Sequence, residues 1–200
     1  MTRSVKNPPS KLRIIGGQWR GRKLAFPDLP GLRPTGDRIR ETLFNWLQGE
    51  LLGAHCLDLF AGSGALGFEA VSRGAASAVL LEQQGAAAKY LVTNCQVLGT
   101  AAIAVLQEDA LAFLAKPAPR QFQLVFMDPP FAADVWQTAC DRLVAGQWLA
   151  PGAWIYLESP RHMVLNAPLN WRLHRQQCAG QVAYCLYQAA AEQSRVDALP

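Results

Sequence analysis

The chain lacks any long apolar run, and this absence excludes a membrane-spanning protein. No apolar stretch approaches the length of about 18 residues that a spanning helix needs. The basic N-terminus also lacks the apolar stretch of a secretory signal. Because 50% of the 200 residues are apolar and only 17% are charged, the chain has the material for one folded domain, or for one domain with a short arm. We expect a cytoplasmic protein with no membrane contact.

Cysteine and histidine are too few and too scattered to form a recognisable metal site. The five cysteines are odd in number and include no Cys-x-x-Cys motif, which indicates reduced thiols: Cys56, Cys95, Cys140, Cys178 and Cys185. The three histidines do not combine with them into the spacing of zinc ligands. The sequence therefore predicts no metal.

Net charge is modest at +4, but its distribution is uneven. Residues 1–40 hold ten Lys or Arg against two acids, a balance of +8, which leaves −4 for the remainder. A charge run alone is typical of a solubilising tail. This run, however, is interrupted by apolar residues that a tail does not need: Ile14, Ile15, Trp19, Leu24 and Phe26. We therefore predict a basic arm that binds a polyanion, attached to a body with a different task.

The first part of the chain reads as a hairpin, a connector and a helix. Two apolar-basic runs, over 11–15 and 22–26, are separated by glycines and predict a β-hairpin. A proline-rich connector follows over 27–34. Asp37 then suits the N-cap of a helix whose apolar face carries Ile39, Leu43, Trp46 and Leu47. Arg38, Arg40 and Glu41 are expected on its other faces. We predict an arm over 1–36, a body over 37–188 and a flexible tail over 189–200.

The body alternates short apolar runs with helical segments. Strands are predicted over 56–60, 78–81, 103–106, 122–127 and 153–157, with helices over 65–73, 86–98 and 134–144 and a short helix after Asp109. Such alternation predicts a parallel sheet covered on both faces. Two later runs, 171–178 and 182–188, flank Ala179-Gly180 and predict an antiparallel hairpin. The fold class is therefore α/β, with a mostly parallel seven-stranded sheet.

A glycine loop follows the first strand of the body. Residues 62–67 match G-x-G-x-x-G, and Glu82 lies 20 residues after Gly62, where a carboxylate can accept hydrogen bonds from ribose hydroxyls. This pattern fits a nicotinamide cofactor or S-adenosylmethionine, and also a tight turn without a ligand. Asp58 favours S-adenosylmethionine, because a carboxylate there suits a cationic amino group better than a pyrophosphate. Asp109 could accept from an adenine amine, or simply cap a helix.

The strand over 122–127 ends in Asp128-Pro129-Pro130-Phe131. The prolines remove two backbone donors, so a carbonyl of Asp128 or Pro129 is left free to accept. Together with the Asp128 carboxylate it matches the two N–H groups of an exocyclic amine, while Phe131 would stack on the base. An isolated turn of this kind also fits a helix cap with a core Phe. Its occurrence with Asp58, Glu82 and Asp109 favours an S-adenosylmethionine-dependent amino methyltransferase.

The sequence resembles the bacterial 16S ribosomal RNA guanine-N2 methyltransferases of the small subunit. The resemblance covers nearly the whole chain and is carried by residues 13–24 and 31–47, by 58–67, 69–70, 72–73 and 128–131, and by 179–184. It implies a Rossmann-like class I methyltransferase fold with an N-terminal RNA-binding hairpin. It also implies methylation of the exocyclic N2 of one guanine, guanine 966 in the usual rRNA numbering, on the small ribosomal subunit. The family often has a second acid two residues past the ribose-binding Glu, where this chain has Gln84.

The resemblance also implies residue roles. The target guanine would be held by Asp128, Pro129, Pro130 and Phe131. The cofactor would be bound by Asp58, Phe60, Ala61, Gly62, Ser63, Gly64, Glu82, Gln83, Asp109, Ala110, Arg38 and Thr42. RNA would be bound by Arg13, Arg20, Arg22, Lys23 and Arg33. We expect a monomer whose partner is 16S rRNA and not DNA.

Three other functions remain to be compared with this one. A DNA adenine-N6 methyltransferase shares the Asp-Pro-Pro-aromatic turn, but it normally needs a target-recognition domain, for which about 40 residues of arm leave little room. A non-catalytic RNA-binding assembly factor would not need Asp58, Glu82 and Asp128 together. A nicotinamide oxidoreductase has no use for a two-acceptor turn facing a base.

Overall fold

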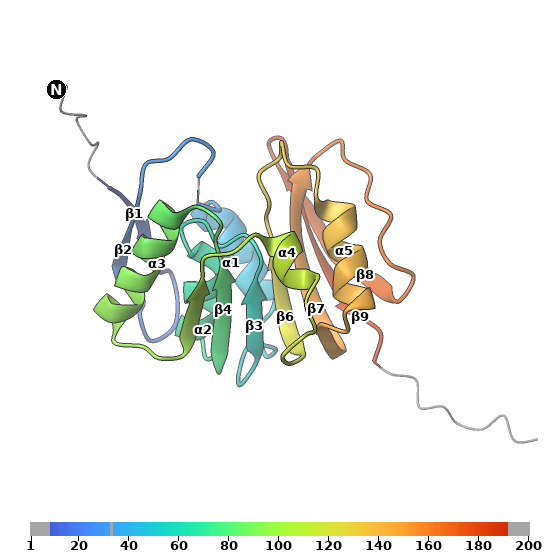
Figure 1. Ribbon diagram of the computed structural model, residues 1–200, viewed down its shortest axis with the longest axis horizontal. Coiled ribbons are helices and arrows are strands. Elements are labelled where there is room, and N and C mark those ends of the chain that lie inside the picture. Colours follow the sequence, from blue (N-terminus) through green and yellow to red (C-terminus); the bar gives the residue numbers. More distant parts are fainter. Residues whose placement is uncertain (1–8, 33, 192–200) are drawn as a thin grey trace, which may run out of the picture.

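The computed structural model describes residues 9–32 and 34–191. Its centre is a seven-stranded sheet with the strand order β5-β4-β3-β6-β7-β9-β8 (Figure 1). The strands are β3 (His55–Asp58), β4 (Ser77–Leu81), β5 (Ile103–Leu106), β6 (Phe122–Met127), β7 (Leu149–Pro160), β8 (Trp171–Ala179) and β9 (Val182–Ala189). The first five pair in parallel, whereas β9 runs antiparallel to both β7 and β8. The predicted Rossmann-like α/β sheet with an antiparallel C-terminal hairpin is confirmed.

The described residues form helices that cover both faces of this sheet. They are α1 (Asp37–Trp46), α2 (Ala65–Ser72), α3 (Gly85–Leu98), α4 (Ala110–Leu114) and α5 (Trp136–Ala145). Leu43 of α1, Phe68 of α2 and Leu91 of α3 belong to one buried apolar layer. Phe113 of α4 and Leu143 of α5 belong to a second layer on the opposite face. The strand order reverses between β3 and β6, and open parallel sheets bind ligands beyond the carboxyl ends of the strands at such a point.

The start of α1 differs from the prediction. Asp37 is its first residue, but Gly36 is the N-cap and no side chain caps the helix. The Asp37 carboxylate instead accepts from Arg40 at 2.6 Å. Arg40 lies one turn along and is fully buried, although its position in the helix suggested a polar face. The carboxylate is therefore used to pair a buried cation and not to cap the backbone.

Two other boundaries also shift. Helix α5 begins at Trp136 and not at residue 134, because Asp134 has a φ of 46°, outside the helical region. Strand β7 extends far beyond the predicted range of 153–157. Its pairing with β6 is irregular between Phe122 and Leu124, which lets the strand continue through a Pro-Gly pair that reads as a turn in the sequence.

Strands β1 (Ser10–Arg13) and β2 (Lys23–Phe26) form the predicted antiparallel hairpin. The hairpin is joined closely to the body, since Ile14, Trp19 and Leu24 are buried in the same apolar layer as α1 and α2. The side-chain amide of Asn94 in α3 also donates to the carbonyl oxygen of Ala25 at 2.9 Å. The apolar residues of the basic segment therefore dock the hairpin onto the body.

The loop between β1 and β2 closes over the C-terminal end of α2. The backbone N–H of Trp19 donates to Oγ of Ser72 (3.0 Å), and that hydroxyl donates to the carbonyl oxygen of Gly16 (2.6 Å). Gly17 has a φ of +74°, and a Cβ there would lie 1.8 Å from the carbonyl oxygen of Ser72. This close approach of two backbones requires glycine.

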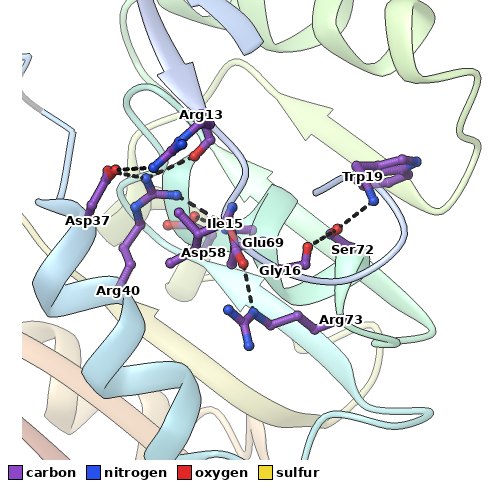
Figure 2. A network of polar contacts seen from close by, with 11 residues as sticks. Arg13, Ile15, Gly16, Trp19, Asp37, Arg40, Asp58, Glu69, Ser72 and Arg73 are labelled. Atoms are coloured by element: carbon purple, nitrogen blue, oxygen red, sulfur yellow. Dashed lines mark hydrogen bonds and ion pairs between the residues drawn. The ribbon is translucent and has the colours of Figure 1, made fainter. Parts of the chain in front are cut away.

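A buried ionic network joins the hairpin, α1 and α2 (Figure 2). Glu69 of α2 is fully buried and accepts from the backbone N–H of Ile15 (2.9 Å), from Arg40 (3.4 Å) and from Arg73 (2.7 Å). Arg40 also donates to the carbonyl oxygen of Arg13 at 3.0 Å. One carboxylate of α2 therefore binds Ile15 and Arg40, which lie 54 and 29 positions away in sequence, as well as Arg73 at the end of its own helix.

Some predictions lie outside the described residues. These are the roles assigned to residues 1–8, to Arg33 and to the tail from residue 192 onward. Strand β9 continues to Ala189, so the predicted body limit at residue 188 falls within the last strand. No helix in the described part of the chain has the length and hydrophobicity to cross a membrane.

Candidate active site

A cavity of about 590 Å³ opens at the carboxyl ends of the parallel strands, a volume typical of small-molecule sites. Its walls come from the residues that follow β3, β4, β5 and β6, from Glu158 near the end of β7, and from the connector before α1. The described lining residues include no lysine, arginine or histidine but six carboxylic acids: Asp58, Glu82, Glu108, Asp109, Asp128 and Glu158. The cavity therefore suits a ligand that brings positive charge and hydrogen-bond donors.

The glycine loop after β3 lines the cavity through residues 60–63. It is held by Glu82, which follows β4 and accepts from the backbone N–H groups of Gly62 (2.9 Å) and Gln84 (2.7 Å). Burial raises the pKa of Glu82, and the two backbone donors oppose part of that rise. A carboxylate has about four lone-pair sites, so Glu82 can fix the loop and still accept from ligand hydroxyls. Gln83 lies beside it in the wall.

Asp58 ends β3 and is almost completely buried. Its Oδ2 accepts from the backbone N–H of Gly67 at 3.1 Å. Burial raises the pKa of Asp58 to about 7, and the neighbouring carboxylates of Asp128 and Glu82 add to the rise, although backbone donors oppose it. A bound cation beside Asp58 would favour its ionised form.

Asp109 serves as the N-cap of α4, which is one of the two roles that the sequence suggested for it. Its Oδ1 accepts from the backbone N–H of Ala112 at 2.8 Å. Asp109 and Ala110 also line the cavity, at the end of β5. Capping and ligand contact are therefore compatible, because the carboxylate has further lone pairs to offer.

The Asp-Pro-Pro-Phe turn follows β6 and lines the cavity through all four residues. Oδ2 of Asp128 accepts from the hydroxyl of Thr35 at 3.2 Å. Burial raises the pKa of Asp128 to about 6, and the Thr35 hydroxyl opposes the rise. Phe131 is 43% exposed and lies against Trp136, with ring centroids 6.2 Å apart. Its outer face is thus open to a flat group entering the cavity.

Three predicted cofactor residues do not belong to the described cavity walls. Gly64 is the N-cap of α2 with a φ of +80°, and a Cβ there would lie 2.4 Å from the Phe68 ring, so its role in the structure is backbone geometry. Arg38 is exposed, and the Thr42 hydroxyl donates to the carbonyl oxygen of Arg38 within α1. Ile39 is the residue of α1 that lines the cavity instead.

Sequence reasoning missed Thr35 and Glu158. Glu158 lies near the end of β7, lines the cavity and accepts from the Tyr156 hydroxyl at 2.8 Å. Burial raises the pKa of Glu158 to about 8, with the Asp128 carboxylate adding to the rise. The signal was available, because Glu158 follows the predicted strand over 153–157 as the other acids follow theirs. Thr35, in the proline-rich connector, carried no comparable signal.

The predicted RNA-binding residues lie on and beside the hairpin. Arg20 and Lys23 are exposed, and Arg22, also exposed, donates to the carbonyl oxygen of Val97 at 3.0 Å. Arg13 is 61% exposed and pairs with Asp37 at 3.8 Å. Within the described residues, no cluster of three or more His, Cys, Asp or Glu side chains has the arrangement of a metal site. The site therefore joins an acidic cavity to a basic, exposed hairpin surface.

Comparison with known proteins identifies a family that this chain matches. A family model described as conserved hypothetical protein 95 matches residues 12–188. Ribosomal RNA small subunit methyltransferase D from Escherichia coli (strain K12) is 51% identical over 184 residues, covering 91% of this chain and 92% of that protein. The protein of the same name from Haemophilus influenzae is 44% identical, covering 91% and 96%. A solved structure of yhhF from Escherichia coli, 49% identical, covers 92% of this chain and 100% of its own, with a TM-score of 0.84.

Proposed function

The chain belongs to the family described as conserved hypothetical protein 95, and we propose that it transfers a methyl group from S-adenosylmethionine to 16S ribosomal RNA. The acceptor is the exocyclic N2 amine of one guanine, guanine 966 in the usual rRNA numbering, on the small ribosomal subunit. The relatives named ribosomal RNA small subunit methyltransferase D, alike over nine-tenths of the chain, support the substrate class.

The observation that carries the proposal is the charge of the cavity. Six carboxylic acids and no basic side chain line it among the described residues, so it fits a cationic, adenosine-bearing cofactor and opposes the pyrophosphate of a nicotinamide cofactor. When bound, S-adenosylmethionine supplies a methyl group on a positively charged sulfur. Asp58 would face its ammonium group, and Glu82 its ribose hydroxyls. Asp109 would accept from its adenine amine.

The Asp128 turn would orient the amine. Its carboxylate accepts one N–H, and the carbonyl oxygen of Asp128 or Pro129 accepts the other, because the prolines leave no local donor to occupy it. Both acceptors direct the nitrogen lone pair toward the methyl carbon, while Phe131 stacks on the base. Asp128 would stabilise the positive charge that develops on the amine nitrogen as it gains the methyl group, and would take the proton that this nitrogen then loses. Thr35 holds the Asp128 carboxylate in place.

The deciding experiment is methyl transfer to small-subunit particles. We expect the purified protein to move labelled methyl from S-adenosylmethionine to unmethylated particles, with nucleoside analysis giving N2-methylguanine at one position. N6-methyladenine as the product would sink the proposal and favour a DNA-type adenine enzyme. If the particles stay unlabelled although the protein binds their RNA, a non-catalytic assembly factor would be favoured.

A substitution at Asp128 separates chemistry from cofactor binding. Asp128→Ala removes an acceptor that faces the amine, so we expect methyl transfer to fall by at least about 100-fold. Cofactor affinity measured by calorimetry should change less than about threefold. Asp141→Asn, at an exposed position of α5, is the matched control and should leave both quantities unchanged. An equal loss of cofactor binding in Asp128→Ala would contradict this role.

A further inference from the structure

Glu158 is a buried carboxylic acid that the proposed chemistry does not use. It is 4% exposed and lines the same cavity as Asp128. Strands β6 and β7 are parallel neighbours, and Met127 of β6 pairs with Leu157 of β7. The next residues, Asp128 and Glu158, are therefore also neighbours, and both reach the cavity. Two acids adjacent at one point of a pocket need an explanation beyond packing, because burying a carboxyl is costly.

The position of Glu158 in the sheet assigns it to the target base. Carboxylic acids stand at or near the carboxyl ends of β4, β3, β6 and β7 in spatial order: Glu82, Asp58, Asp128 and Glu158. In the proposed function the first two face the cofactor and Asp128 faces the reacting amine. Glu158 lies on the far side of Asp128 from the cofactor. Any base whose amine reaches Asp128 therefore presents its neighbouring ring atoms toward Glu158.

The ring atom beside the amine differs between the purines. In guanine the 2-amine adjoins N1–H, which is a donor. In adenine the 6-amine adjoins N1 without a proton, which is an acceptor. We propose that a carboxyl oxygen of Glu158 accepts a hydrogen bond from guanine N1–H and so makes the site specific for guanine. This inference rests on the proposed methyl transfer, and it supplies the base selectivity that the Asp-Pro-Pro-Phe turn alone does not.

The surroundings of Glu158 support an oriented acceptor. The Tyr156 hydroxyl donates to its Oε1 at 2.8 Å, and Tyr156 is itself fully buried. The indole N–H of Trp136 donates to the Glu158 backbone carbonyl at 2.7 Å, and the same indole lies against Phe131. Side chain and backbone are thus both fixed, so the second carboxyl oxygen has a defined place in the cavity. A group tethered in this way can discriminate by position and not only by charge.

The test compares two bases at the methylated position. Small-subunit particles are reconstituted with rRNA that carries either guanine or 2-aminopurine there; 2-aminopurine keeps the 2-amine but has an unprotonated N1. At a pH above about 8, where the Glu158 carboxyl is ionised and can only accept, we expect the wild-type kcat/KM to favour guanine by at least about 100-fold, since a site that binds N–H leaves its acceptor unpaired with the analogue. In Glu158→Gln the preference should fall by at least about tenfold, because the amide can also donate to N1. The missing O6 of 2-aminopurine affects both proteins and cancels in this comparison.

Tyr156→Phe keeps the carboxyl and removes only the hydroxyl that orients it, and it should lower the preference by about threefold or more. Asp141→Asn should keep the wild-type preference. Failure of wild-type protein to methylate the guanine particles at all would refute the proposed function. Suppose instead that the wild-type protein methylates guanine, and that Glu158→Gln and Tyr156→Phe both keep its preference for guanine. That result would overturn only the assignment of Glu158. Equal losses of kcat/KM on guanine and on 2-aminopurine in these variants would also overturn that assignment, since they would indicate that the Glu158 carboxyl has only a structural role.

Discussion

Removing Glu69 should destabilise the protein strongly, because this one carboxylate holds three elements together. Glu69 has no exposed surface and accepts from Ile15, Arg40 and Arg73. In Glu69→Ala the fully buried Arg40 guanidinium keeps only Asp37 as a charge partner, and that carboxylate is 54% exposed. The N–H of Ile15 also loses its acceptor. The substitution therefore leaves an incompletely paired buried cation and an unpaired amide at the joint between hairpin and body.

The expected size of the loss follows from those two groups. Breaking a buried ion pair by removing one partner costs about 3–5 kcal/mol, and an unpaired amide costs about 1–3 kcal/mol. The two share one site and do not add fully, so we expect about 4 kcal/mol. With a urea m-value of about 2 kcal/mol/M, the unfolding midpoint should fall by about 2 M. That is a large part of the typical stability of about 5–15 kcal/mol.

Urea unfolding followed by tryptophan fluorescence measures this directly. Glu41→Ala, an exposed acid of α1, is the matched control and should change stability by less than about 0.5 kcal/mol. The apolar double variant Arg40→Met/Glu69→Leu removes cation and anion together, so it should lose less than Glu69→Ala alone. A loss below about 1 kcal/mol in Glu69→Ala, or a double variant less stable than the single one, would refute this account of the joint.

Four further predictions concern ligands and pH. Neutralising the hairpin cations together (Arg20, Arg22 and Lys23) should weaken RNA binding and lower its salt slope by about 2–3, whereas Arg120→Ala, before β6 at the opposite end of the strands, should not. Glu82→Ala should weaken S-adenosylmethionine binding by at least about tenfold in calorimetry, and unchanged affinity would exclude the ribose contact. Methyl transfer should fall as pH drops through about 6, where Asp128 is protonated. Stability of the ligand-free protein should instead fall as pH rises from about 4 to 8, because raised pKa values at Asp58 and Glu158 mean that the folded state holds more protons than the unfolded state there. Urea midpoints that rise over that interval would contradict the linkage.

The sheet and most of its helices could be predicted because their signals are local. Apolar runs bounded by glycine, proline and acids mark the strands, and β5 and β6 have the predicted limits. Boundaries failed where backbone geometry overrides pattern, as at Asp134 with its positive φ. The strand predicted over 153–157 is too short for a related reason, since β7 continues where its pairing with β6 is irregular, and that pairing depends on both strands. The pairing between two strands cannot be predicted from the sequence of either strand alone.

Within the candidate site, the acids that follow strands were predictable and the groups that hold them were not. Asp58, Glu82 and Asp128 stand at strand ends, where topology brings them to one edge of the sheet. Thr35 reaches Asp128 across 93 positions of sequence, and no pattern in a proline-rich connector announces such a contact. Arg40 was assigned a polar face of α1, and its burial depends on Glu69 lying opposite in α2. Contacts between residues so far apart in sequence can be identified only in the folded structure.

The basic hairpin and the acidic cavity, which account for the uneven charge of the sequence, are both contacted by the segment over 35–40. Toward the cavity, Thr35 donates to the Asp128 carboxylate, and Ile39 is a lining residue. Toward the hairpin, Asp37 and Arg40 pair with each other, and Arg40 donates to the carbonyl oxygen of Arg13 at the end of β1. The hairpin and the target-amine acceptor are therefore separated by one turn of α1. The hairpin and the acid proposed to orient the amine therefore contact the same short segment, Thr35 on one side and Arg40 on the other. The basic surface proposed to bind RNA and the acidic cavity thus share one structural support at the start of α1.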